Sequence, residues 1–193
     1  MNKNLLILGA GQYGTVAKEI AQSMKSFDKI DFLDDSYGID NPNYHEESIG
    51  RFHDYDRYVT DYGYAIVAIG NPKVRREWIE KLEASGYRIP ALVSPRAYVS
   101  PSAQIKKGSI IEPLAGIHAN AIIGAGTIVS MGAIVNHNSM VMGYCHIDCG
   151  AIVMGGAIVK SGEKVEAHDV VRKQAVTVTS KIVIDSICKE QKN

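Results

Sequence analysis

Aliphatic residues recur at every sixth position through the second half of the chain. The spacing holds without a gap at Val99, Ile105, Ile111, Ile117, Ile123, Val129, Val135, Val141, Ile147, Val153, Val159 and Val165. An α-helix advances about 100° per residue, so a six-residue period would scatter these side chains around it, whereas an extended chain keeps them on one face. The pattern predicts a parallel β-helix, in which three short strands complete a coil of 18 residues and successive coils stack.

The positions next to this inward row indicate what the remaining side chains face. The residue two places before each member is small, apart from Glu163. The residue one place before points outward, and most such residues are apolar: Ile110, Ile122, Ile128, Ile134, Met140, His146, Ile152 and Ile158. Because a prism in water does not normally expose such rows, we expect them to pack against other subunits, and a three-sided prism favours a homotrimer. Residues 136–138 then fall at a corner beside a subunit seam.

Upstream of Tyr98 the pattern changes to alternating strands and helices. The apolar runs LLIL, KIDFL and YAIVAIG predict three strands, with one helix through about Ala21 and a second in KVRREWIEKLEASG. The polar and aromatic stretch DDSYGIDNPNYHEESIGRFHDYDRY predicts a loop-rich excursion. The fold class is therefore an α/β domain, a βαβαβ Rossmann-like module over residues 1–95, followed by a β-helix domain over residues 96–193.

A glycine-rich loop joins the first strand of this module to its first helix. The stretch GAGQYG holds Gly9, Gly11 and Gly14 at the spacing that lets a backbone approach a phosphate at a helix N-terminus. Asp34 and Asp35 follow the second strand, about 20 residues after the last glycine. A nicotinamide dinucleotide usually needs two such halves, so the single module favours a mononucleotide or a nucleotide sugar. A tight turn without a ligand is the alternative.

Composition and charge exclude several classes of partner. Lys plus Arg and Asp plus Glu both total 21 in the 193 residues, and no basic stripe indicates nucleic acid. No apolar run approaches the length of about 18 residues that membrane insertion needs, so we expect a cytoplasmic protein. The cysteines Cys145, Cys149 and Cys188 form no CxxC pair, and no metal site is expected.

The combination of these motifs resembles a known family. A single βαβαβ module with GAGQYG, a strand-end DD, an IGN strand end, and hexapeptide coils bearing VNHN and GYCHIDCGAIVMGG is similar to the bacterial sugar acetyltransferases of the sialic-acid O-acetyltransferase type. That family includes N-acetyltransferases of nucleotide-linked 4-amino sugars. The resemblance implies a left-handed β-helix, acetyl-CoA as cosubstrate and a nucleotide-linked amino sugar as acceptor.

The resemblance also implies roles for individual residues. His137 corresponds to the general base that takes a proton from the acceptor, with Asn138 beside it, His146 lies by the acetyl-CoA, and the backbone N–H of Gly155 is placed near the thioester carbonyl. A near-neutral imidazole and a fixed N–H suit a direct transfer without a covalent enzyme intermediate. The family's nucleotide-sugar site maps to Gly11, Gln12, Tyr13, Asp34, Asp35, Gly70 and Asn71.

Three departures from the family pattern accompany these matches. The family usually has Asp or Glu where Asn138 stands, many relatives have Asn where Ser130 stands, and the C-terminal GxPA stretch that helps to seat CoA is absent from residues 169–193. The expected function is an acetyl-CoA-dependent N-acetyltransferase acting on a nucleotide-linked amino sugar for surface polysaccharide or glycan synthesis. The alternatives are a sugar O-acetyltransferase, since the same base serves amine and hydroxyl, and a trimeric nucleotide-sugar-binding protein without turnover. A β-helix zinc enzyme of the carbonic-anhydrase kind lacks its close histidine pair, because His137 and His146 are nine residues apart.

Overall fold

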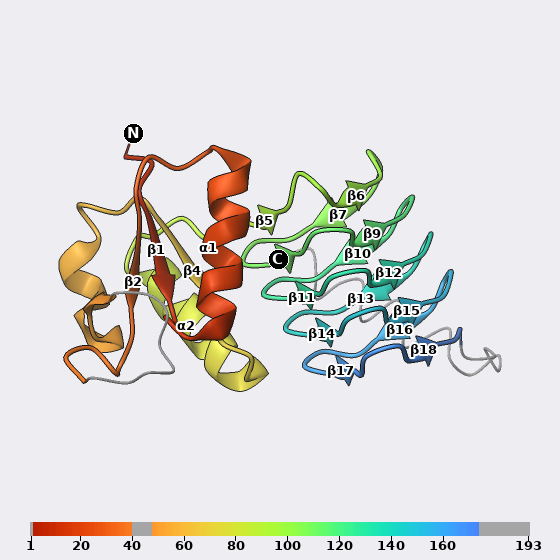
Figure 1. The fold of residues 1–193 in the computed structure, drawn as a ribbon. Coiled ribbons are helices and arrows are strands. Elements are labelled where there is room, and N and C mark those ends of the chain that lie inside the picture. Colours follow the sequence, from red (N-terminus) through yellow and green to blue (C-terminus); the bar gives the residue numbers. More distant parts are fainter. Residues whose placement is uncertain (1, 40–47, 174–193) are drawn as a thin grey trace.

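A computed structural model describes residues 2–39 and 48–173 of the chain; Cys188 and the rest of residues 174–193 lie outside the described residues. The N-terminal domain is a parallel four-stranded sheet with two helices (Figure 1). Its strand order is β3-β2-β1-β4, with Leu5 in register with Ile30 and Tyr64. The elements are β1 (Leu5–Leu8), α1 (Gln12–Met24), β2 (Ile30–Leu33), β3 (Ser48–Gly50), the 3₁₀ helix η1 (Phe52–Tyr58), β4 (Tyr64–Val67) and α2 (Pro72–Ala84).

The two helices cover opposite faces of this sheet because side chains alternate along each strand. Leu5 and Ile7 point to the face covered by α1, and Leu6 and Leu8 point to the face covered by α2. The stretch expected to be loop-rich contributes β3 and η1. The three predicted strands and two predicted helices are present, and β3 extends the sheet by one parallel edge strand.

The second domain is a three-sided parallel β-helix. Its strands are β5 (Leu92–Val93), β6 (Tyr98–Val99), β7 (Gln104–Ile105), β8 (Ile110–Ile111), β9 (Gly116–Ile117), β10 (Ile122–Ile123), β11 (Ile128–Val129), β12 (Ile134–Val135), β13 (Met140–Val141), β14 (His146–Ile147), β15 (Ile152–Val153), β16 (Ile158–Val159), β17 (Lys164–Val165) and β18 (Val170–Val171). They form a first face of β5-β8-β11-β14-β17, a second face of β6-β9-β12-β15-β18 and a third face of β7-β10-β13-β16. Because β5 pairs with β8, the β-helix begins at Leu92, slightly before the expected boundary at residue 96.

The core of the β-helix confirms the six-residue pattern. The row from Ile111 to Val165 is buried inside the prism together with the small residues two places earlier, such as Ala115, Ala133 and Cys145. Strand partners lie 18 residues apart, as in Ile134 opposite Ile152. Each coil therefore buries the apolar rung of the next, as the sequence predicted.

The outward rows differ from expectation on one of the three faces. Leu92, Ile110 and Ile128 of the first face are at most 1% exposed. Leu92 and Ile110 join the cluster that α1 forms with the sheet. Figure 1 shows α1 standing between the sheet and the β-helix. At Leu92, Ile110 and Ile128 the first face is thus covered by the chain's own N-terminal domain. Ile134 (44% exposed) and Ile158 (39%) instead leave the second and third faces open to solvent.

Arg75 of α2 connects the two domains by hydrogen bonds to backbone carbonyls in both. Its guanidinium is fully buried and donates to the carbonyl oxygens of Ile69 and Gly70 at the end of β4. It also donates to the carbonyls of Gly126 and of Tyr144 and Cys145 at two corners of the β-helix. Burial lowers the pKa of Arg75. Among the described residues no carboxylate pairs with it, so backbone carbonyls alone accept its hydrogen bonds. No helix in the described part of the chain is long and apolar enough to cross a membrane.

Candidate active site

His137 lies in the turn between β12 and β13, at the corner where the second face meets the third. The ring of His118, one coil earlier, lies 6.1 Å from the His137 ring between centroids, and Tyr98 lies 6.4 Å from His118. His137 is exposed in the single chain. The corner predicted from the repeat is confirmed, and its aromatic column runs along the edge of the two open faces.

The His137 imidazole is held between a side chain and a glycine. Its Nδ1 lies 3.0 Å from Nδ2 of Asn138, whose left-handed backbone (φ 54°) turns the side chain back toward the ring. A Cβ atom added to Gly155, one coil later, would lie 2.8 Å from Cε1 and 2.9 Å from Nε2 of the ring. The ring can take this position only because residue 155 has no side chain. In the described part of the chain Nε2 has no hydrogen-bond partner, so it is the nitrogen available to a substrate.

The backbone of Gly155 also has an unused donor. The neighbouring Gly156 N–H donates to the His137 carbonyl at 3.0 Å, which ties the two corners together. No acceptor among the described residues takes the Gly155 N–H. An imidazole nitrogen and a backbone donor, both without a partner among the described residues, therefore share one corner, and acyl transfer to a nucleophile uses two such groups.

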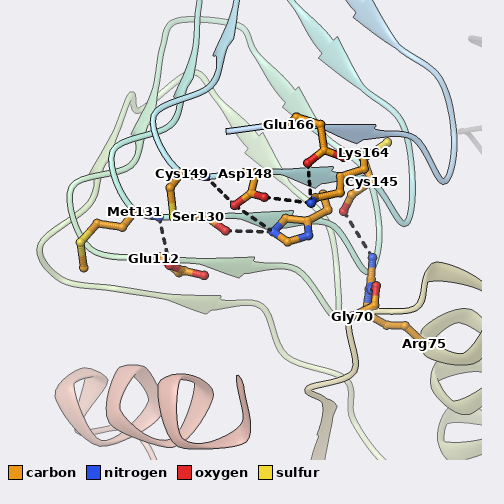
Figure 2. A network of polar contacts seen from close by, with 11 residues as sticks. Gly70, Arg75, Glu112, Ser130, Met131, Cys145, Asp148, Cys149, Lys164 and Glu166 are labelled. Carbon is orange, nitrogen blue, oxygen red and sulfur yellow. Dashed lines mark hydrogen bonds and ion pairs between the residues drawn. The ribbon is translucent and has the colours of Figure 1, made fainter. Parts of the chain in front are cut away.

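His146 lies on β14 in the first face, away from this corner. Its Nε2 is 3.0 Å from the Ser130 hydroxyl and 4.0 Å from Asp148. Burial is the main cause that lowers the pKa of His146, so the ring is neutral at pH 7. Figure 2 shows the carboxylate of Asp148 turned toward Lys164, and their ion pair measures 3.0 Å. Although partial burial opposes its ionisation, hydrogen bonds from Cys149 N–H and Lys164 hold the pKa of Asp148 below its usual range.

Glu112 and Tyr13 join this cluster to the glycine loop. Glu112 is almost fully buried, accepts from the Met131 N–H at 3.0 Å, and has its pKa raised chiefly by burial. The Tyr13 hydroxyl at the start of α1 is buried beside Glu112 without a well-formed hydrogen bond, and burial raises its pKa well above the ordinary value. The sequence does not place Glu112 or Arg75 at the domain junction, because no local pattern marks either residue as buried there. In the sequence Ser130 stands out only by its departure from the family pattern.

Some glycines of the loop are required by the turn itself, and others border open space. Gly9 has φ +109°, and a Cβ on Gly14 would lie 2.1 Å from the Gly9 carbonyl, so both are required by the turn itself. A Cβ on Gly11 or Gly70 would meet nothing within 4 Å. Gly11 and Gly70 therefore border open space at the carboxyl ends of β1 and β4, where ligands of parallel α/β sheets bind.

The remaining predicted binding residues differ in how many hydrogen bonds they already make within the chain. Asp34 is 6% exposed, and its carboxylate accepts from Ala10 N–H at 2.8 Å and from the backbone and hydroxyl of Ser36. Asn71 caps α2 through hydrogen bonds from the N–H groups of Lys73 and Val74. Gln12 and Asp35 are exposed, and Asp35 accepts only from Phe52 N–H among its described contacts.

The predicted residues thus form two groups within one chain. The glycine loop, Tyr13 and His146 lie at the junction of the N-terminal domain and the first face, and His137 with Gly155 lies at the opposite corner. One chain does not bring the two groups together. Within residues 2–39 and 48–173 no group of three or more His, Cys, Asp or Glu side chains could hold a metal ion.

Comparisons with known proteins agree with both domains. Residues 4–82 match the family model of the PglD N-terminal domain. The acetyltransferase domain of PglB from Neisseria gonorrhoeae FA1090, solved in complex with acetyl coenzyme A, is 29% identical, with 88% of this chain and 85% of that chain covered and a TM-score of 0.74. PerB from Caulobacter crescentus, in complex with CoA and GDP-perosamine, is 17% identical over 89% of this chain and 97% of that chain, with a TM-score of 0.64. WeeI from Acinetobacter baumannii AYE is 20% identical over 86% of this chain and 92% of that chain, with a TM-score of 0.61.

These likenesses agree with the family and the fold class expected from the sequence. The two more distant structures show the fold alone, whereas the PglB domain shares sequence along both domains. The Rossmann-like module followed by a left-handed β-helix is confirmed, and the chain is similar along both domains to the acetyltransferase domain of PglB, with an N-terminal region that matches the PglD N-terminal domain.

Proposed function

We propose that this protein transfers the acetyl group of acetyl-CoA to the amino group of a nucleotide-linked amino sugar, with His137 as general base. The observation that carries the proposal is that Nε2 of His137 lies against Gly155, and that among the described residues neither this nitrogen nor the Gly155 N–H has a hydrogen-bond partner. A nucleophilic amine would lose a proton to Nε2 as it attacks the thioester, and the Gly155 N–H would stabilise the oxyanion that forms. Collapse of the oxyanion would break the C–S bond and release the CoA thiolate, which takes up the proton. The similar PglB domain binds acetyl coenzyme A, which supports the donor.

The acceptor binds, in this proposal, at the glycine loop through its nucleotide. Gly11 and Gly70 leave room for a phosphate, Gln12 and Asp35 are exposed beside them, and the α1 N-terminus favours an anion. The Asp34 carboxylate holds the loop in place by accepting a hydrogen bond from the Ala10 N–H. Tyr13, His146 and Ser130 then line the path from the nucleotide toward the β-helix, and a neutral His146 can donate to a carbonyl of acetyl-CoA or of the sugar.

The separation of the two groups is the reason to propose a homotrimer. The open second and third faces carry Ile134 and Ile158 and meet at the His137 corner. Burying these faces between subunits would bring His137 of one subunit toward the domain junction of another. We place the reaction in the cytoplasm, where acetyl-CoA and nucleotide sugars occur, and its product in surface polysaccharide or glycan synthesis.

The test is release of CoA from acetyl-CoA with UDP-, dTDP- and GDP-linked 4-amino sugars, alongside the corresponding 4-hydroxy sugars. Transfer to the amino sugars alone supports N-acetylation, and transfer to hydroxyls alone would replace it with O-acetylation. His137→Ala should lower kcat about 10²- to 10⁴-fold. His53→Ala, which removes an exposed histidine of the N-terminal domain, is the matched control and should leave kcat unchanged. Equal values of kcat for His137→Ala and the control would refute the role of His137 as general base.

A further inference from the structure

The amide of Asn138 faces a second amide, that of Asn120. Asn120 occupies the same corner one coil earlier, and its Nδ2 lies 3.3 Å from Oδ1 of Asn138. Both residues have left-handed backbones, with φ 58° and 54°. The Asn120 N–H in turn donates to the Ser102 hydroxyl of the coil before. A ladder of side-chain contacts therefore runs from Asn120 through Asn138 to Nδ1 of His137, and Ser102 holds the backbone of Asn120.

The orientation of the Asn138 amide decides whether His137 can act as a base. A neutral imidazole carries one proton, and Nε2 can accept a proton only if that proton is on Nδ1. Nδ1–H must donate to an acceptor, so Asn138 has to present its oxygen to the ring. With the amide nitrogen facing Nδ1, as at 3.0 Å here, Nδ1 is the acceptor and the ring proton lies on Nε2. An aspartate at position 138 would have no such ambiguity.

The orientation of Asn138 is coupled to that of Asn120 because the two amides must complement each other. When Asn120 donates through Nδ2, Asn138 accepts through Oδ1 and turns its nitrogen to His137. A half-turn of both amides about the Cβ–Cγ bonds preserves both contacts and reverses every donor and acceptor. Asn120 then accepts, Asn138 donates to it, and the Asn138 oxygen faces Nδ1–H.

We infer that Asn120 is a positioning residue that selects the tautomer of His137 through Asn138. The inference rests on the proposed role of His137 as general base. It assigns a function to a residue that touches neither the ring nor the substrate. During the reaction the acceptor proton moves to Nε2, and the charge of the resulting imidazolium is stabilised best when the Asn138 oxygen faces Nδ1–H. The ordinary explanation of Asn120, that asparagine suits a left-handed turn, leaves the tautomer unaffected, so the two explanations can be separated.

The test compares Asn120→Asp with Asn120→Gly, since both residues fit the left-handed turn. An ionised aspartate only accepts, so it should hold Asn138 in the orientation that leaves Nε2 free. Glycine removes the ladder contact. Protein labelled with ¹⁵N-histidine reports the His137 tautomer directly by NMR, without any substrate, and His137→Ala assigns the signal. We expect a larger Nδ1–H fraction in Asn120→Asp than in Asn120→Gly. Identical tautomer populations in the two variants would overturn the inference.

Kinetics with acetyl-CoA and the amino-sugar panel provide the second readout. Asn120→Gly should lower kcat about fivefold, the factor that one hydrogen bond of about 1 kcal/mol gives, and Asn120→Asp should match or exceed the wild type. Leu114→Gly is the matched control, because Leu114 (φ 63°) is an exposed left-handed residue at another corner. If His137→Ala is inactive while Asn120→Gly behaves like Leu114→Gly, the inference fails and the proposed function stands. Full activity of His137→Ala would instead remove the proposed function.

Discussion

The ring of His137 lies directly against the backbone of Gly155, so close that a Cβ at residue 155 would be 2.8 Å from the ring. Gly155→Ala should therefore displace the imidazole and lower kcat by about 10²-fold, the loss that a shift of about 1 Å in a catalytic group can cause. The backbone of Gly155 has no left-handed φ, so alanine fits the turn itself. The measurement is kcat together with the thermal unfolding midpoint.

Gly116→Ala is the control for this substitution. Gly116 lies in β9 of the second face, and an added Cβ would have only Ile134 Cγ1 nearby, at 4.0 Å. We expect its kcat to stay near that of the wild type. A fully active Gly155→Ala variant would mean that the ring position seen here is not the one used in catalysis.

The open faces of the β-helix give a prediction about assembly. A trimer should have a mass of about 63 kDa, three times the 21.0 kDa chain, by light scattering at micromolar concentration. Ile134→Glu and Ile158→Glu should each shift the mass toward the monomer, because a buried unpaired carboxylate opposes association. Tyr37→Glu changes an exposed aromatic residue of the N-terminal domain and should not alter the mass. A monomeric wild type would contradict both the trimer and the shared site.

How far the sequence predicts this molecule depends on the kind of contact. The six-residue period specifies the β-helix because each inward residue, such as Val135, meets its equivalent in the next coil. The outward residues Ile110 and Ile134 look alike in the sequence, yet one is covered by α1 and the other is exposed. The difference arises from the path of the chain between α2 and β5, which no local pattern encodes.

The candidate site likewise combines residues that local motifs predict with residues whose role depends on distant parts of the chain. His137, Gly155 and the glycine loop stand in recognisable motifs, whereas Arg75 is one of two adjacent arginines on an amphipathic helix. Its burial depends on carbonyl groups of corners about 50 and 70 residues away in the chain. Asn120 could have been found by stepping back 18 residues, one coil, from Asn138.

The two adjacent aspartates after β2 should respond differently to substitution. Asp34→Ala leaves the buried Ala10 N–H without its acceptor, so it should cost about 1–3 kcal/mol of stability and weaken acceptor binding as well. Asp35→Ala should raise the acceptor KM while leaving the unfolding midpoint and the KM for acetyl-CoA unchanged. Unfolding curves and both KM values distinguish the two variants. An unchanged acceptor KM in Asp35→Ala would remove this residue from the nucleotide-sugar site.

Glu112 should make stability depend on pH in a specific direction. Its folded pKa is raised above the ordinary 4.5 by burial, so its contribution to stability is full below about pH 4.5 and is lost as the pH rises through the folded value. Glu112→Gln removes this loss, and its amide can bond to the nearby Tyr13 hydroxyl. The variant should unfold a few degrees higher than the wild type at pH 8, since about 1 kcal/mol corresponds to about 2–4 °C in a chain of this size.

Glu19→Gln makes the same chemical change on the exposed side of α1 and serves as the control. Its unfolding midpoint should follow that of the wild type at every pH between 4 and 9. If Glu112→Gln is instead less stable than the wild type at pH 8, the ionised carboxylate contributes more through the Met131 N–H than its burial costs.

Arg75 gives the sharpest test of how the domain junction supports the site. Arg75→Met would remove the guanidinium donor from five carbonyl oxygens, two of them at Ile69 and Gly70 beside the glycine loop. Of the five, the Cys145 carbonyl keeps a hydrogen bond from the Ile128 N–H. At about 1–3 kcal/mol for each unsatisfied buried group, the loss of stability should reach at least about 3 kcal/mol. Arg75→Lys should recover only part of this stability, because an ammonium has three donors and cannot reach all the carbonyls that the planar guanidinium spans. Arg76→Met, which breaks the exposed pair with Glu80 and removes the guanidinium over the Tyr144 ring, should cost only about 1 kcal/mol. Urea unfolding of the three variants measures these differences, and similar losses for Arg75→Met and Arg76→Met would show that the junction does not depend on the buried guanidinium.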